Sequence, residues 1–204
     1  GLFVAGYGIS AVLMAAFESV LTTYFQPRFY QALSNNDQTE QSRAWSKYAG
    51  AILPSLILVI FVMVGLAPEL TRFMVGPAYQ SASQYVVWGV LAEGARVAAG
   101  VYGMSAHARM KTNLLLLPNL IGAAVCVPLI WLLSNRYGAH GIGLAQVLSS
   151  FAVVVSMYYL MIKSLEMRAS YRPLLKSIVM GVSLLLIAML GRWLFGDAQS
   201  LWVA

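Results

Sequence analysis

Residues 114–162 read LLLLPNLIGAAVCVPLIWLLSNRYGAHGIGLAQVLSSFAVVVSMYYLMI. The stretch contains two apolar runs, residues 114–133 and 141–162, on either side of a short polar segment with Arg136. A helix needs about 20 apolar residues to cross the hydrocarbon core of a bilayer, and both runs reach that length. The stretch therefore predicts two transmembrane helices joined by a short connection.

Four further apolar runs meet or approach the same length, at about residues 2–25, 48–67, 85–106 and 174–195. Of the whole chain of 204 residues, 60% are hydrophobic and 10% are charged, whereas a soluble domain carries about 25% charged residues. The first run is long and five more follow it, so none is a signal peptide. The sequence predicts an all-α, polytopic integral membrane bundle of about six transmembrane helices.

Several classes of function lack the residues that they need. Cys126 is the single cysteine, and the two histidines, His107 and His140, lie far apart in the sequence, which excludes a disulfide framework and argues against a metal cluster. No nucleophile motif, glycosidase carboxylate pair or phosphate-binding glycine loop is present, so we expect neither an enzyme nor a cofactor. The net charge of +6 comes from scattered residues, which is not the pattern of a nucleic-acid-binding face.

The positive residues indicate how the spans are oriented. Nine of the 13 Lys and Arg residues fall in the connections after the first, third and fifth spans, three fall on the opposite side, and Arg96 lies within a span. Positive connections stay in the cytoplasm. We therefore expect the first span to run from the outside to the inside.

The longest of these connections contains Asp37 and, three residues later, Glu40. This is the spacing of a capping box, in which carboxylates accept hydrogen bonds from the free amides of a starting helix. It predicts a short interfacial helix that leads into Arg43, Trp45 and Lys47. The alternative is a solvated linker with Trp45 as an aromatic anchor at the interface.

Glu93 and Arg96 are the charged residues nearest to the middle of a span. They lie three positions apart, hence on one face of a helix, and charges at that depth are costly unless they face a cavity, a partner or water. Two interpretations remain open and are compatible: a mutual ion pair that packs against another helix, or two side chains that line a cavity. We name both as candidate substrate-binding residues.

Glu18, in the inner third of the first span, is a third candidate substrate-binding residue. Its carboxylate can point into a cavity and pair with a cation from another helix, or it can reach the membrane interface. Arg28, Arg109 and Lys111 stand at the expected cytoplasmic mouth, where Arg is suited to phosphate recognition. The topology rule alone also accounts for these three positive residues.

Two kinds of uncharged polar residue within the spans have both structural and functional interpretations. Asn119 follows Pro118, and its amide can bond a backbone carbonyl freed by the helix rather than a substrate. Tyr7, Tyr24 and Tyr102 could stack on sugars, although aromatic anchoring at the membrane interface is the commoner use.

Four elements in order resemble a known pattern. The first element is a Gly-x-aromatic start, Gly1 to Phe3, which leads to Pro27 and Arg28, and the second is a span with Pro54 that leads into the segment APELTRFMVGPAYQSA. The third is a span that ends in the basic turn His107 to Arg109. The fourth is the segment NRYGAHGIGLAQVLSS, in which Gly138, Gly141 and Ala145 follow the pattern Gly-x-x-Gly-x-x-x-Ala. Gln146 stands where that pattern has Thr. Over about residues 1–163 the sequence resembles the polysaccharide (O-antigen and exopolysaccharide) flippases of the multidrug/oligosaccharidyl-lipid/polysaccharide exporter superfamily.

The resemblance implies that the chain forms most of the second lobe of a two-lobe transporter and that an N-terminal lobe is missing from it. We also expect the chain to be a fragment, because both of its ends look cut. It implies a transporter in the cytoplasmic (inner) membrane that flips a polyprenyl-diphosphate-linked sugar by alternating access, with a polysaccharide polymerase and glycosyltransferases as possible partners. Arg96 would attract the anionic head group, and Glu93 would orient it or couple its movement to protons or cations.

Two other functions remain open. A multidrug or cation antiporter of the same superfamily would need an acidic residue in the cavity for the coupling ion, and Arg96 beside Glu93 argues mildly against it. A non-transporting membrane scaffold of a polysaccharide assembly complex would use the charged residues as ion pairs only.

Overall fold

The computed structural model describes residues 1–33, 37–108, 112–162 and 171–195. Its elements in order are α1 (Leu2–Leu33), α2 (Gln38–Gly65), α3 (Ala67–Met74), η1 (Pro77–Ala82), α4 (Ser83–Ala108), η2 (Thr112–Leu115), α5 (Leu116–Ile162) and α6 (Tyr171–Phe195). The described part of the chain is helical and contains no strand. The predicted all-α class is confirmed.

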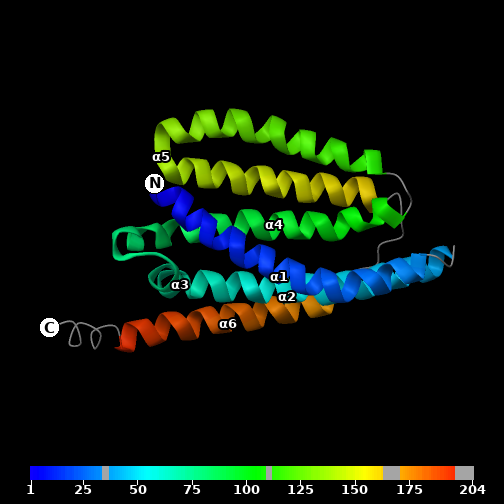
Figure 1. The fold of residues 1–204 in the computed structure, drawn as a ribbon, viewed down its shortest axis with the longest axis horizontal. Helices are drawn as coiled ribbons and strands as arrows, with labels where there is room; N and C mark the ends of the chain where they lie inside the picture. The colour runs from blue at the N-terminus through cyan, green and yellow to red at the C-terminus, as the bar shows by residue number, and fades with distance from the viewer. Residues whose placement is uncertain (34–36, 109–111, 163–170, 196–204) are drawn as a thin grey trace.

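The helix α5 consists of two arms that lie side by side and run in opposite directions (Figure 1). The chain reverses at Gly138, whose φ of 55° and ψ of −131° belong to a region that glycine adopts without a steric penalty. A side chain at Gly141 would overlap the backbone of Leu133, and one at Gly122 would overlap Val153 of the other arm. Glycine therefore permits both the tight reversal and the close packing of the arms.

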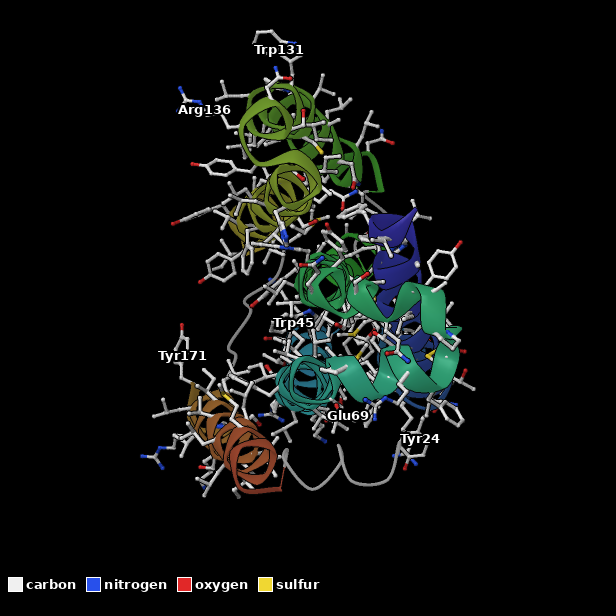
Figure 2. All side chains as sticks on the ribbon, turned by 90° about the vertical axis from the view of Figure 1, so that its left-hand side faces the viewer. Tyr24, Trp45, Glu69, Trp131, Arg136 and Tyr171 are labelled. Carbon is white, nitrogen blue, oxygen red and sulfur yellow. The ribbon has the colours of Figure 1, made fainter. Side chains whose placement is uncertain are left out.

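Within the part of the chain that the structure describes, four helices are long and apolar enough to cross a membrane: α1, α2, α5 and α6. Large apolar side chains are exposed along α5 and α6, among them Trp131 on the outer arm of α5 (Figure 2), which is 72% exposed. Such a surface is costly in water and favourable in lipid. The molecule is a membrane protein.

The helix α4 lies at the centre of the bundle and packs against α5, α1 and α2. Its 26 residues span about 39 Å at 1.5 Å per residue, which is enough to cross a bilayer, although it carries Glu93 and Arg96. Trp45 of α2 is fully buried against it and donates a hydrogen bond from Nε1 to the carbonyl oxygen of Val101, at 3.1 Å. Figure 2 shows Trp45 pointing into the interior. Among the described elements, α6 packs on α2.

The second span begins ten residues earlier than the apolar run suggested. Asp37 is the N-cap of α2 and accepts a hydrogen bond from the backbone amide of Thr39, at 2.9 Å, so the expected capping role is confirmed. The predicted helix over this segment is present, but it is not separate from the second span, because α2 continues without interruption through Lys47 and Tyr48. The alternative of a linker with Trp45 as an interfacial anchor is wrong, since Trp45 is buried.

Positive side chains gather at one end of the bundle. The end of α1 and the start of α2 lie together, and α6 begins on the same side of the bundle but further in along α2 (Figure 1). These segments carry Arg28, Arg43, Lys47, Arg172 and Lys176, and we call this end the basic end. The opposite end carries Arg72 and Arg136 among the described residues. Arg109 and Lys111, predicted at the mouth, lie outside the described residues.

Candidate functional site

Four side chains form a continuous polar network between α1 and α4. The hydroxyl of Tyr7 donates to Oε1 of Glu93 at 2.5 Å. Arg96 donates from Nε to Oε2 of Glu93 at 2.6 Å, and from Nη2 to Oε2 of Glu18 at 2.8 Å. We refer to Tyr7, Glu93, Arg96 and Glu18 as the Arg96 network. Arg96 therefore holds two carboxylates, one from its own helix and one from α1.

The helices place these groups at matching depths. Glu93 and Arg96 are the eleventh and fourteenth of the 26 residues of α4, so they lie in its middle turns and on one face. Tyr7 and Glu18 are 11 residues apart on α1, which is about three helical turns, and both face α4. The network therefore spans the central part of the α1–α4 contact.

Small residues let α1 and α4 approach closely enough for these bonds. A Cβ atom at Gly89 of α4 would lie 2.7 Å from Oγ of Ser10, and one at Gly6 of α1 would lie 2.9 Å from Cβ of Tyr85. Ser10 is buried, and its hydroxyl donates across the interface to the carbonyl oxygen of Val86 at 2.9 Å. Close approach through small residues, with a hydroxyl bonded across the contact, is a usual way for membrane helices to associate.

Counted formally, the network has two carboxylates for one guanidinium. The side chain of Glu93 is 11% exposed, that of Glu18 is 30% exposed and that of Arg96 is 49% exposed. Glu93 is thus fixed in the interior by two hydrogen bonds, whereas Arg96 and Glu18 present part of their polar surface to a cavity.

That cavity has a volume of about 430 Å³ and lies between α1, α4 and α5. Its polar lining combines the Arg96 network with groups from α4 and α5: Tyr7, Glu18, Glu93, Arg96, His107, Asn119 and Ser150. Asn119 donates a hydrogen bond to the carbonyl oxygen of Leu115 at 2.7 Å, which confirms the structural role expected for it. The cavity has the size and polarity to take a polar group inside an otherwise apolar bundle.

Two more cavities continue from this one toward the basic end. A cavity of about 180 Å³ shares Glu18 and His107 with the network cavity and also has Tyr48 in its wall. Tyr48 in turn belongs to a cavity of about 620 Å³ at the basic end. The shared residues place the three cavities in series, from the middle turns of α4 to the end of α1.

The structure brings together three of the six residues singled out in the sequence, namely Glu18, Glu93 and Arg96. The two interpretations of Glu93 and Arg96 hold together, because the residues form an ion pair and also line the cavity. Arg28 lies apart from them, in the cavity at the basic end. Arg109 and Lys111 lie outside the described residues.

Sequence reasoning missed two features of the site. It left Tyr7 as an interfacial or sugar-stacking aromatic, although an 11-residue spacing from Glu18 places both on one helix face. It also treated Arg43 and Lys47 as topology signals, whereas both line the cavity at the basic end. Their spacing of four residues on one helix was the available signal.

Comparisons with protein families, with curated proteins and with solved structures find no match to this chain. In the described part of the chain, no three His, Cys, Asp or Glu side chains lie close enough together to hold a metal ion. The interpretation of the site therefore depends on its geometry and charge.

Proposed function

We propose that this chain forms most of one lobe of a secondary transporter that flips a lipid-linked oligosaccharide across the cytoplasmic membrane by alternating access. The observation that carries the proposal is the Arg96 network, which lines a polar cavity inside a bundle of membrane helices. Ionised groups within membrane spans are costly and commonly mark substrate or ion pathways.

The chemistry of Arg96 suits a phosphate head group. Its planar guanidinium presents five donors in a fixed fork that matches phosphate oxygens. Glu93 and Glu18 engage Nε and Nη2, so they hold the fork in one orientation while the Nη1 edge stays available among the described residues. In this proposal Arg96 binds the diphosphate, and the polar cavity wall takes the sugar.

The series of cavities supports a path for a polar head group. The path begins at the basic end with the cavity that contains Arg28, and it ends at Arg96. The exposed apolar surfaces of α5 and α6 allow the lipid tail to remain in the bilayer. In this proposal the basic end faces the cytoplasm, by the positive-inside rule, and α1 runs from outside to inside.

The charge of the network favours one second candidate, a proton- or cation-coupled exporter of smaller molecules. The network has two carboxylates for one guanidinium, and this formal excess of negative charge attracts a cation. In this alternative Glu18 is the coupling residue, because it is the more exposed carboxylate.

The test is transport by the full-length protein in proteoliposomes. A labelled polyprenyl-diphosphate oligosaccharide is placed in one leaflet, and its appearance in the other leaflet is followed for the unaltered protein, Arg96→Ala and Arg172→Ala. The last variant is the matched control, since it removes an exposed arginine of α6 outside the three cavities. Transport that is lost in Arg96→Ala and kept in Arg172→Ala is the expected result.

Other outcomes separate the alternatives. Exchange of cations or drugs without movement of the lipid-linked sugar supports the second candidate. Transport of the sugar that is unchanged by Arg96→Ala overturns the assigned site. Movement of neither class of molecule contradicts both transport functions and favours a membrane scaffold.

A further inference from the structure

The cavity at the basic end, which we call the basic pocket, is distinct from the network cavity. It has a volume of about 620 Å³ and is lined by Phe25, Arg28, Phe29, Gln31, Ala32, Glu40, Arg43, Ala44, Lys47 and Tyr48. None of these residues lines the network cavity. The end of α1 and the start of α2 build the basic pocket.

Positive charge dominates its rim. Arg43 and Lys47 are four residues apart on α2, so they project from one face of that helix, and Arg28 joins them from α1. All three side chains are exposed. Glu40 is the single carboxylate among the lining residues, so the lining has two positive charges in excess. The guanidinium of Arg28 also lies over the ring of Tyr24, at 4.4 Å from its centroid, a contact that restricts its position.

The interior wall of the basic pocket is aromatic. Phe29 is 2% exposed, and its ring centroid lies 5.7 Å from that of the buried Tyr48. Phe25 adds a partly buried ring. A cationic rim above an apolar wall suits a ligand with an anionic head and an apolar body, and a free anion would gain nothing from the rings.

We propose that the basic pocket binds the phosphate head group of an anionic lipid at the membrane surface. Basic pockets between membrane helices are the usual recognition sites for anionic lipid head groups. Arg28, Arg43 and Lys47 contact the phosphate oxygens, and the ring of Phe25, which is only partly buried, contacts the start of the acyl chains. The proposal concerns the cavity at which the proposed transport path begins, but it does not require transport, because a bound phospholipid needs only this end of the bundle.

The experiment measures lipid binding to the purified full-length protein in detergent by native mass spectrometry. The probes are a short-chain phosphatidylglycerol, a phosphatidylcholine with the same chains, and inorganic diphosphate. The pocket variant is R43Q/K47Q. The matched control is R172Q/K176Q, which removes two exposed positive charges with the same spacing at the same end, on α6 and outside the basic pocket.

Phosphatidylglycerol is expected to bind with a defined stoichiometry and phosphatidylcholine is not. Each cation near an anionic lipid contributes about fivefold in affinity, so R43Q/K47Q should bind phosphatidylglycerol about 30-fold more weakly, while R172Q/K176Q keeps its affinity. Glu40→Gln removes the single lining carboxylate and should bind about fivefold more tightly. This opposite change keeps the proposal testable if R43Q/K47Q does not fold.

Three results would overturn the proposal. Equal losses in R43Q/K47Q and R172Q/K176Q would show general attraction to the basic end. Diphosphate that binds as tightly as phosphatidylglycerol would show a site for free anions. Binding that Glu40→Gln leaves unchanged would show that the charge of the lining does not determine affinity.

Discussion

Arg96 on α4 and Glu18 on α1 are 78 positions apart in the sequence, yet their side chains form an ion pair of 2.8 Å in the middle of the helix bundle. Glu93 completes the coordination of the same guanidinium at 2.6 Å. The two carboxylates differ in exposure and in the number of hydrogen bonds that they accept. The two carboxylates should therefore contribute unequally to stability.

Replacement of Glu93 should destabilise the protein more than replacement of Glu18. Glu93→Gln weakens two charge-assisted hydrogen bonds at a buried carboxylate, those from Tyr7 and Arg96, and should cost about 2 kcal/mol. Glu18→Gln weakens one pair between partly exposed groups and should cost about 1 kcal/mol or less. Thermal unfolding in detergent measures both, and an equal loss in the two variants would contradict the ranking.

Gly89→Ala should push α1 and α4 apart. The new Cβ would lie 2.7 Å from Oγ and 2.8 Å from Cβ of Ser10, and such overpacking costs about 1–3 kcal/mol. Gly8→Ala on α1 is the control, because a Cβ there meets nothing within 4 Å and alanine favours the helix. Melting temperatures should fall for the first variant and hold or rise for the second.

Gly138→Ala should strain the reversal between the two arms of α5. An L-residue with a side chain rarely adopts a φ of 55° with a ψ of −131°, and the expected cost is about 1–3 kcal/mol. Spin labels at exposed positions on each arm report the distance between them. The control is Gly50→Ala, because a Cβ there has open space. We expect a broader distribution of distances between the arms in Gly138→Ala than in Gly50→Ala. Equal distributions would mean that the packing of the two arms does not depend on Gly138.

The start of α2 should weaken in acid. Hydrogen bonds from the side chain and the backbone amide of Thr39 lower the pKa of Asp37 below its ordinary value. A depressed folded-state pKa gives stability that is present above the unfolded pKa of about 4 and is lost as pH falls through the folded value. Hydrogen exchange in the first turn of α2 should therefore gain protection as pH rises through this range. In Asp37→Asn, which still caps the helix, protection should not depend on the titration of this side chain.

The sequence was sufficient to predict features set by local composition. Apolar runs located the long helices, apart from the start of α2, and the polar segment around Arg136 located the reversal inside α5. A run of about twenty apolar residues and the polar break that follows it can be recognised without knowledge of the packing. The spacing of Glu93 and Arg96 likewise predicted that they share a helix face. Their pairing followed from that spacing and from the cost of burying charge.

Features that depend on how two helices pack were not predictable from one chain. Whether Glu18 meets Arg96 depends on the rotation of α1, which Gly6 and Gly89 set through their contacts across the interface. Trp45 was misplaced at the interface because its burial requires the backbone carbonyl of Val101 on another helix. The capped segment at Asp37 and the apolar run from residue 48 were predicted as separate elements, although they form the single helix α2.

The surroundings of Arg96 act differently on ligands of opposite charge, because two carboxylates lie around one guanidinium. An anion that reaches the Nη1 edge of Arg96 also comes near the carboxylates of Glu18 and Glu93, which repel it, whereas a cation is attracted by them. An anion that arrives together with a cation is repelled less, because the cation balances one of the carboxylates.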